Sequence, residues 1–238
     1  MKAIILCGGL GSRLGLIDVP KPMYRIANKP ILEHNILLLK KYGIEDICIP
    51  LHHGGDLIRN YFLDGSKWGV KIQYFFEEKL LGTSGAVKNV EQFIGREPFF
   101  VVYGDNYTNI NLTKMLDFHI LEKSKVTIAV FHPEKNLNCK IAGGVITTDD
   151  KHNILSFIEG KGIKPQNSFV NAGVYILEPD IVSQIPNDKP SDFGRDIFPK
   201  MLSQGCKIKT YVTDGFVLAI DTKEALKIAE EVVDKESL

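Results

Sequence analysis

Short apolar runs alternate along this chain with stretches in which apolar residues recur every three or four positions. The runs AIIL, DICIPL, KIQYFF, FFVVYGD and VTIAVF are typical of buried strands, and the stretches between them have helical periodicity. Strands that alternate with helices of about ten residues predict a mostly parallel sheet that is covered on both faces. We therefore expect an α/β fold with three layers and a doubly wound sheet.

Two of the predicted helices have recognisable ends. The stretch ILEHNILLLKKYG predicts a helix that stops at Gly43, because glycine favours the position just after a helix. The stretch NLTKMLDFHILEKS predicts a helix whose N-cap is Asn111. Its predicted core-facing stripe consists of Leu112, Met115, Leu116 and Leu121.

The pattern changes near residue 140, where GGVITTDDKHNILSFIEG and SFVNAGVYILEP predict a region rich in β-structure. We expect three further elements to follow. They are a helix at DFGRDIFPKMLSQG, a short β segment at KIKTYVTDGFVLAID and a closing helix at TKEALKIAEEVVDKE. No repeat, low-complexity tract or flexible linker divides the chain. We predict a single domain, 1–238, with one lobe over about 1–135 and a second lobe with the closing helices over 136–238.

Charge and cysteine content narrow the class of partner. The 29 Lys and Arg residues balance the 29 Asp and Glu residues, so no overall field attracts nucleic acid or an anionic membrane. The four cysteines are dispersed and match neither a disulfide framework nor a zinc site. No apolar run is long enough to span a bilayer. We expect a cytoplasmic protein with a small-molecule ligand, and the sequence leaves open whether it forms a homo-oligomer.

A glycine-rich loop follows the first apolar run. Glycines let backbone amides approach an anion closely, and Arg13 and Lys21 supply positive charge nearby. A GxGxxG dinucleotide motif would need glycine where Leu14 stands, and the GK[ST] sequence of a Walker A motif is absent. A nucleoside triphosphate bound in another manner remains the favoured ligand. The glycines of this loop are Gly8, Gly9 and Gly11.

Asp105 ends the apolar run FFVVYGD, just after a glycine. A carboxylate at the end of a buried strand projects into the mouth of the sheet, where it suits Mg²⁺, which binds few carboxylates together with phosphate oxygens. The alternative is that Asp105 caps a turn or a helix.

Seven segments of this chain resemble, in the same order, the motifs of the sugar-1-phosphate nucleotidylyltransferases. They are GGLGSRL, PKPM, NKPILEH, LGTSGAVKN, FVVYGDN, NAGVYILEP and DFGRDIFPKML. The resemblance covers nearly the whole chain. It implies a Rossmann-like nucleotidyltransferase fold with a smaller, β-containing sugar-binding lobe. The implied substrates are a nucleoside triphosphate and a sugar 1-phosphate, and the implied cofactor is Mg²⁺. The implied catalytic residues are Arg13, Lys21 and Asp105.

The resemblance also implies binding residues. The nucleotide contacts would be Leu6, Gly8, Gly9, Gly11, Ser12, Arg13, Glu77, Gly82 and Thr83. The sugar contacts would be Gly144, Glu159, Lys161 and Asn171. The family pattern has Glu and Lys adjacent, whereas Gly160 separates Glu159 from Lys161 in this chain. Asn171 has the alternative role of a turn residue that satisfies its own backbone.

The second metal ligand of the family falls in DGFVLAIDTKEAL, where the chain departs from the usual Trp-x-Asp pattern. When Thr222 is aligned on the family's threonine, Ala219 stands at the position of the aspartate. Residues two apart on a strand face the same side, so Asp221 is expected to replace the missing ligand. The alternative role for Asp221 is N-cap of the final helix.

Glu77 stands at the family's base-reading position, where thymidylyl and uridylyl relatives commonly carry Gln. An ionised carboxylate only accepts hydrogen bonds. It therefore suits the adjacent N1–H and N2–H of guanine, although the N4 amine of cytosine would also be satisfied. Because the chain also resembles guanylyltransferases that act on mannose or heptose phosphates, we expect GTP.

Two other functions remain open. A cytidylyltransferase acting on a sugar, polyol or choline-type phosphate is favoured by the IDT ending and the short loop between Arg13 and Lys21. An inactive regulatory subunit that binds nucleotide sugars is favoured by Ala219 but disfavoured by Arg13, Lys21 and Asp105. The chain ends soon after the predicted closing helix, so we expect no β-helix extension of the kind some relatives carry.

Overall fold

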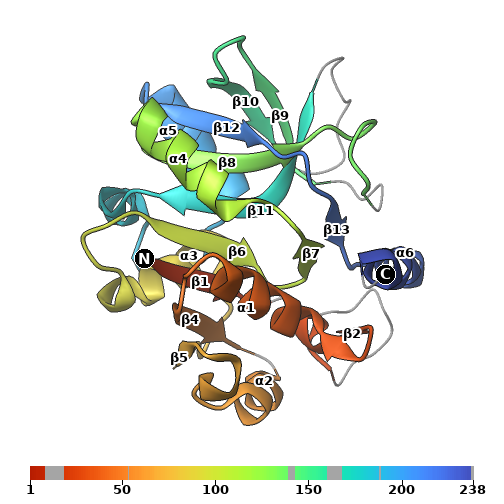
Figure 1. The fold of residues 1–238 in the computed structure, drawn as a ribbon. Helices are drawn as coiled ribbons and strands as arrows, with labels where there is room; N and C mark the ends of the chain where they lie inside the picture. The colour runs from red at the N-terminus through yellow and green to blue at the C-terminus, as the bar shows by residue number, and fades with distance from the viewer. Residues whose placement is uncertain (9–18, 53, 139–142, 160–167, 188, 237–238) are drawn as a thin grey trace.

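The computed structural model describes residues 1–8, 19–52, 54–138, 143–159, 168–187 and 189–236. Nine strands of these residues form one central sheet (Figure 1). Seven of them lie in the order β10 (Ile154–Ile158), β9 (Val145–Thr148), β11 (Phe169–Leu177), β6 (Phe99–Tyr103), β1 (Lys2–Leu6), β4 (Asp46–Leu51) and β5 (Lys71–Phe76). The other two are β8 (Val126–Phe131), which pairs with β11, and β12 (Ile208–Val212), which pairs with β8.

The half of the sheet that contains the N-terminal strand is parallel. Strand β1 pairs in parallel with β4 and β6, and β4 pairs in parallel with β5. Strand β11 runs antiparallel to β6 and to β8. The carboxyl ends of β1 and β6 lie side by side, with Leu6 opposite Tyr103. Ligands of open α/β sheets bind at such an edge. The predicted α/β fold with a mostly parallel central sheet is confirmed.

Helices cover both faces of the sheet. On one face, α1 (Ile31–Lys41), α2 (Gly55–Phe62) and α4 (Leu112–Glu122) pack in one apolar cluster with alternate residues of the strands. On the other face, α3 (Gly82–Asn89) and α5 (Phe198–Ser203) pack in a second cluster with the intervening strand residues. In Figure 1, α1 and α4 lie in front of the sheet and α3 lies behind it. This alternation explains why the strands are apolar throughout.

Short helical turns connect these elements. They are η2 (Lys21–Met23), η3 (Ser66–Trp68), η4 (Glu91–Phe93), η5 (Pro179–Gln184) and the π-helical turn η6 (Phe193–Ile197). Among the described residues, no helix is long and apolar enough to cross a membrane.

The two helix ends predicted from sequence are confirmed. Gly43 has a φ of +73° just after α1, and the Asn111 side chain accepts a hydrogen bond from the Lys114 amide at 3.0 Å. The predicted stripe on α4 is wrong at Leu121, which is 78% exposed. Nine residues of an α-helix turn through about two and a half turns, so Leu121 lies opposite Leu112. The buried position one turn further along the stripe is His119 instead.

The segment KIKTYVTDGFVLAID forms two strands in different sheets, whereas a single β segment was predicted. β12 joins the central sheet, and β13 (Val217–Ala219) pairs antiparallel with β7 (Asn106–Thr108) in a separate two-stranded sheet. A second small sheet contains β2 (Arg25–Ile26) and β3 (Lys29–Pro30). The closing helix α6 (Lys223–Glu236) packs against β2 and β13 (Figure 1).

Candidate active site

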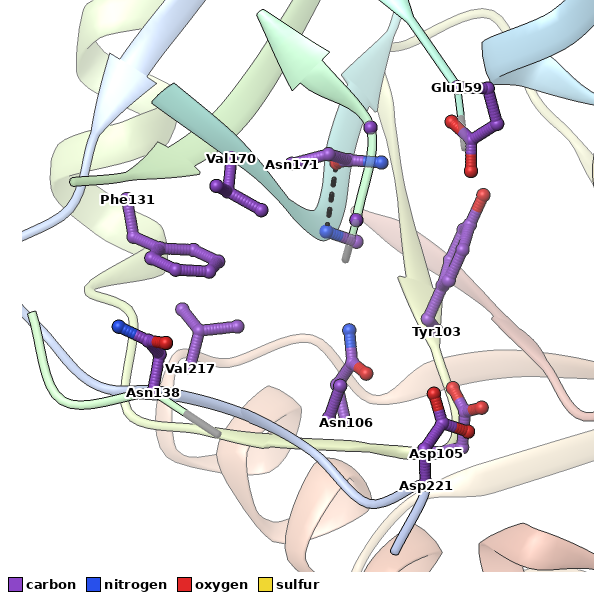
Figure 2. Close-up of a pocket in the computed structure, with 14 residues that line it drawn as sticks. Tyr103, Asp105, Asn106, Phe131, Asn138, Glu159, Val170, Asn171, Val217 and Asp221 are labelled. Atoms are coloured by element: carbon purple, nitrogen blue, oxygen red, sulfur yellow. Dashed lines mark hydrogen bonds between the residues drawn. The ribbon is translucent and has the colours of Figure 1, made fainter. Parts of the chain in front are cut away.

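Two adjoining cavities open beside the carboxyl ends of β1 and β6, and both are lined by Tyr103 and Asp105. The β1 cavity, of about 250 Å³, is also lined by Leu6, Gly8, Lys21, Glu77, Gly82 and Thr83. The β11 cavity, of about 210 Å³, is also lined by Asn106, Gly144, Glu159, Asn171, Val217 and Asp221, and Figure 2 shows it. All the described residues predicted to bind nucleotide line the β1 cavity, and all those predicted to bind sugar line the β11 cavity.

The small sheet of β7 and β13 places two aspartates at the junction of the cavities. Asp105 directly precedes β7, and Asp221 follows β13 by two residues. The Ile220 amide donates a hydrogen bond to the Asp105 carbonyl oxygen at 3.1 Å. The two carboxylates lie close together in Figure 2, which explains how residues far apart in sequence share one site.

Lys21 contacts both carboxylates. Its Nζ lies 3.5 Å from Asp105 Oδ2 and forms a closer ion pair with Asp221 Oδ1. Lys21 begins η2, and Pro20 and Pro22 on either side of it restrict the backbone there. A cation is thus held where two acidic groups converge.

The N-cap of α6 is Thr222 and not its neighbour Asp221. The Thr222 hydroxyl accepts a hydrogen bond from the Ala225 amide at 3.1 Å, and the Thr222 carbonyl oxygen accepts one from the Leu226 amide at 3.1 Å. Thr222 therefore caps α6. The side chain of Asp221 instead lines the β11 cavity and pairs with Lys21.

The electrostatics of this cluster favour a further cation. Burial raises the pKa of Asp105 and the carboxylate of Asp221 raises it further, while Lys21 opposes both effects without cancelling them. Burial lowers the pKa of Lys21, but Asp105 and Asp221 raise it by more, so the ammonium is held charged. Although the chain surrounds Asp105 closely, its side chain is 31% exposed because it opens to both cavities.

Asp105 and Asp221 fit the requirements of Mg²⁺. No group of three or more His, Cys, Asp or Glu side chains is gathered for metal binding among the described residues. Magnesium, however, usually takes one or two carboxylates and completes its shell with phosphate oxygens and water. Two carboxylates that already share one cation at the edge of both cavities form such a donor set.

Glu77 presents an unsatisfied acceptor in the β1 cavity. The residue is 8% exposed, and its Oε1 has no hydrogen-bond partner among the described residues. Burial raises the pKa of Glu77 to about 7, although a hydrogen bond from the Leu81 backbone opposes the shift. A buried acceptor without a partner is costly. A ligand with N–H donors would relieve this cost.

Gly82 and Thr83 begin α3 at the wall of the β1 cavity. Gly82 has a φ of +74°, and a Cβ there would lie 2.5 Å from the Ser191 carbonyl oxygen. The close approach that requires glycine is therefore to the chain itself. The Thr83 amide and hydroxyl both donate to Asp192 Oδ1, at 3.1 and 3.2 Å.

Gly144 and Glu159 form one wall of the β11 cavity. A Cβ at Gly144 would lie 2.7 Å from Glu159 Oε2 and 2.6 Å from the Phe157 ring. Burial raises the pKa of Glu159, and Arg195 opposes the shift. The bare backbone of Gly144 therefore keeps the carboxylate of Glu159 accessible from the cavity.

Asn171 lies on the same cavity in strand β11. Its Oδ1 accepts a hydrogen bond from the Gly173 amide at 3.0 Å, as Figure 2 shows, and its Nδ2 donates to the Tyr175 hydroxyl at 2.7 Å. The local backbone bond that was the alternative role for Asn171 is present, and the residue lines the cavity as well.

Tyr103, Asn106 and Asp192 are among the polar cavity residues that sequence reasoning missed. Tyr103 is the polar-tipped last residue of an otherwise apolar strand, which is the only local signal it carries. Asn106 donates from Nδ2 to the Ala172 carbonyl oxygen at 3.0 Å and so links β7 to β11. Asp192 begins the motif DFGRDIFPKML, but its contact with Thr83 is formed only in the folded chain.

Five predicted site residues lie outside the described part of the chain. They are Gly9, Gly11, Ser12, Arg13 and Lys161.

A family model described as "Nucleotidyl transferase" matches residues 2–217. Among curated proteins, the chain is 34% identical over 222 residues to UTP–glucose-1-phosphate uridylyltransferase of Synechocystis, covering 86% of this chain and 56% of that protein. It is 35% identical over 219 residues to D-glycero-alpha-D-manno-heptose 1-phosphate guanylyltransferase of Campylobacter jejuni, covering 90% of this chain and 94% of that protein. The chain thus spans about half of the first relative and nearly all of the second.

The fold also matches a solved structure over almost its full length. HddC from Yersinia pseudotuberculosis superposes with a TM-score of 0.83 at 28% identity, covering 98% of this chain and 99% of that chain. The same protein has also been solved in complex with GMP-PN.

Proposed function

Because the chain belongs to the nucleotidyl transferase family, we propose that it transfers GMP from GTP to a mannose- or heptose-type sugar 1-phosphate and releases pyrophosphate. The enzyme class follows from the family. The choice of nucleotide and sugar is the proposal, and it agrees with the guanylyltransferase named among the relatives.

The observation that carries the proposal is the meeting of two cavities at Asp105. Nucleotidyl transfer brings an oxygen of the sugar phosphate to the α-phosphorus of the nucleotide. The new P–O bond forms on one side while the bond to pyrophosphate breaks on the other. Two binding sites with one shared wall suit this arrangement. We assign the β1 cavity to the nucleotide and the β11 cavity to the sugar. In this proposal the nucleotide-binding lobe spans about 1–135 and the sugar-binding lobe spans 136–238.

Crowded negative charge is the main barrier to such a reaction, so positive groups matter more than an acid or a covalent nucleophile. Lys21, at the junction of the cavities, would neutralise charge on the phosphates. In the proposal Arg13 does the same. Asp105 and Asp221 would hold Mg²⁺, which supplies further electrostatic stabilisation when bound.

The preference for guanine rests on Glu77. Its Oε1 is buried and lacks a partner among the described residues, in the cavity assigned to the nucleotide. The N1–H and N2–H of guanine are adjacent donors that a carboxylate accepts together. Uracil and thymine offer only the N3–H beside two carbonyl oxygens, which would leave one oxygen of Glu77 facing an acceptor.

The experiment is a substrate matrix with product identification. The four ribonucleoside triphosphates and dTTP are each incubated with Mg²⁺ and with mannose, heptose, glucose or N-acetylglucosamine 1-phosphate, or with choline phosphate, and products are identified by mass spectrometry. GDP-mannose or GDP-heptose is expected. A CDP product alone would keep the enzyme class and overturn the base assignment. Nucleotide binding without any product would favour the regulatory function.

A further inference from the structure

A chain of hydrogen bonds and polar contacts runs along the boundary between the two cavities. Asn171 Nδ2 donates to the Tyr175 hydroxyl at 2.7 Å, and that hydroxyl donates to the Tyr103 hydroxyl at 3.2 Å. The Tyr103 and Thr83 side chains both line the β1 cavity, where they interact electrostatically. The Thr83 hydroxyl in turn bonds to Asp192 Oδ1 at 3.2 Å. We call these five residues the tyrosine chain.

The two ends of the tyrosine chain lie in different cavities. Asn171 lines the β11 cavity, whereas Thr83 and Asp192 line the β1 cavity. Tyr103 lines both cavities. Tyr175 has no exposed surface and lines neither of them. The two binding surfaces are therefore joined through a residue that a ligand in these cavities does not touch.

Packing ties the members of the chain together. The Tyr175 ring meets the Tyr103 ring edge to face at 5.6 Å and the Phe193 ring in the same manner at 5.6 Å. The Phe193 amide donates to the Thr83 hydroxyl at 2.9 Å, which gives a second connection from Tyr175 to Thr83. Gly173 packs directly against the Tyr103 ring, because a Cβ at this position would lie 3.0 Å from Tyr103 Cγ. Displacement of one ring would thus disturb both ends.

We propose that the tyrosine chain couples the two substrates, so that each binds more tightly when the other is present. The inference rests on the proposed function of the two cavities. A ligand at either end orders the side chain it contacts, and the shared hydrogen bonds and ring contacts extend that order to the other end. The second substrate then loses less conformational freedom on binding. Tyr103 and Tyr175 act in this account as positioning residues.

Calorimetry with a non-reacting pair tests the coupling. The dissociation constant of α,β-methylene-GTP is measured with and without mannose 1-phosphate, and the reciprocal experiment must give the same factor. The wild-type protein is expected to show a factor of about fivefold or more, the lower end of typical coupling. Tyr175→Phe is expected to reduce that factor to about one, while the affinity for each ligand alone and the melting temperature stay near their wild-type values.

Two further variants separate coupling from general loosening of the fold. Tyr74→Phe removes a buried tyrosine hydroxyl of β5 that has no hydrogen-bond partner among the described residues, and it should keep the wild-type coupling factor. Because Tyr175 acts through Tyr103, the double variant Tyr103→Phe and Tyr175→Phe should lose no more coupling than Tyr175→Phe alone.

The outcomes distinguish this inference from the proposed function. A wild-type protein that binds neither compound would contradict the proposed function and this inference with it. A wild-type protein that binds both without coupling, or a Tyr175→Phe variant that keeps wild-type coupling, would overturn the inference alone.

Discussion

Lys21 and Asp221 form an ion pair across 200 residues of sequence. Strand β13 pairs with β7, which directly follows Asp105, so the end of β13 lies beside Asp105. Asp221 is therefore close to Lys21, which also contacts Asp105. One ammonium thus balances two carboxylates at the junction of the two cavities. The cluster keeps a net negative charge that a divalent cation would complement.

Replacing Asp221 tests its assignment as a metal ligand. Asp221→Ala is expected to lower kcat by on the order of 10²-fold or more, because a charge placed for the transition state is lost. It should also raise the Mg²⁺ concentration needed for half the maximal rate. The measurement is a Mg²⁺ titration of initial rates. Asp56→Ala, at an exposed carboxylate of α2, is the matched control. Wild-type Mg²⁺ dependence in Asp221→Ala would rule the assignment out.

A second prediction concerns the choice of base. Glu77→Gln replaces an acceptor pair by one acceptor and one donor, which suits uracil better than guanine. The ratio of kcat/KM for GTP to that for UTP is expected to fall by about tenfold or more, since one mispaired buried hydrogen bond is involved. Glu78→Gln, at the exposed neighbouring position, should leave the ratio unchanged. An unchanged ratio in Glu77→Gln would remove Glu77 from base recognition.

The same residue predicts how stability depends on pH. Burial raises the pKa of Glu77 from 4.5 to about 7 in the folded protein. Between these values the folded state binds more protons than the unfolded state, so Glu77 makes wild-type stability fall as pH rises through this window. Glu77→Gln removes the ionisation. We compare the free energy of unfolding of Glu77→Gln with that of the wild-type protein at each pH. The difference, variant minus wild type, should be more positive at pH 8 than at pH 5 by about 1–3 kcal/mol.

Urea unfolding of both proteins at the two pH values measures this difference. Equal differences at pH 5 and pH 8 would show that Glu77 does not titrate in this window.

Gly144 offers a selective block of the β11 cavity. Gly144→Ala places a methyl group 2.7 Å from Glu159 Oε2, so the wall must shift. The KM for sugar 1-phosphate is expected to rise by about tenfold, in line with a clash costing on the order of 1–3 kcal/mol, while the affinity for nucleotide stays unchanged. Gly95→Ala is the control, because a Cβ there would meet only Lys2 Nζ at 4.0 Å. A parallel loss of nucleotide affinity would contradict the division into two sites.

The parallel half of the sheet and the ends of α1 and α4 could be predicted from local patterns. Apolar strands, Gly43 and Asn111 act through neighbouring residues, and neighbouring residues are visible in sequence. Leu121 shows the limit of this approach. The prediction added Leu121 to an apolar stripe, although its angle around the helix axis places it on the exposed side. The division of one predicted β segment into β12 and β13 depends on partners elsewhere in the chain.

The candidate site shows the same contrast. As far as the structure describes them, the residues predicted to bind nucleotide line one cavity and those predicted to bind sugar line the other. The role of Asp221 could not be decided in sequence, because one spacing suited both a ligand and a cap. The Thr222 cap and the Lys21 ion pair decide where the side chain of Asp221 goes. Tyr103 was missed because its connections to Tyr175 and Thr83 exist only in the folded chain.

The most direct test of the account is pyrophosphate release from GTP with mannose 1-phosphate or D-glycero-α-D-manno-heptose 1-phosphate, with and without Mg²⁺, in the wild-type protein and in Asp105→Asn. The account predicts Mg²⁺-dependent release that requires a sugar phosphate and falls by on the order of 10²-fold or more in Asp105→Asn. Pyrophosphate release that is independent of the sugar phosphate, or an Asp105→Asn variant as active as wild type, would contradict a transfer centred on the junction of the two cavities.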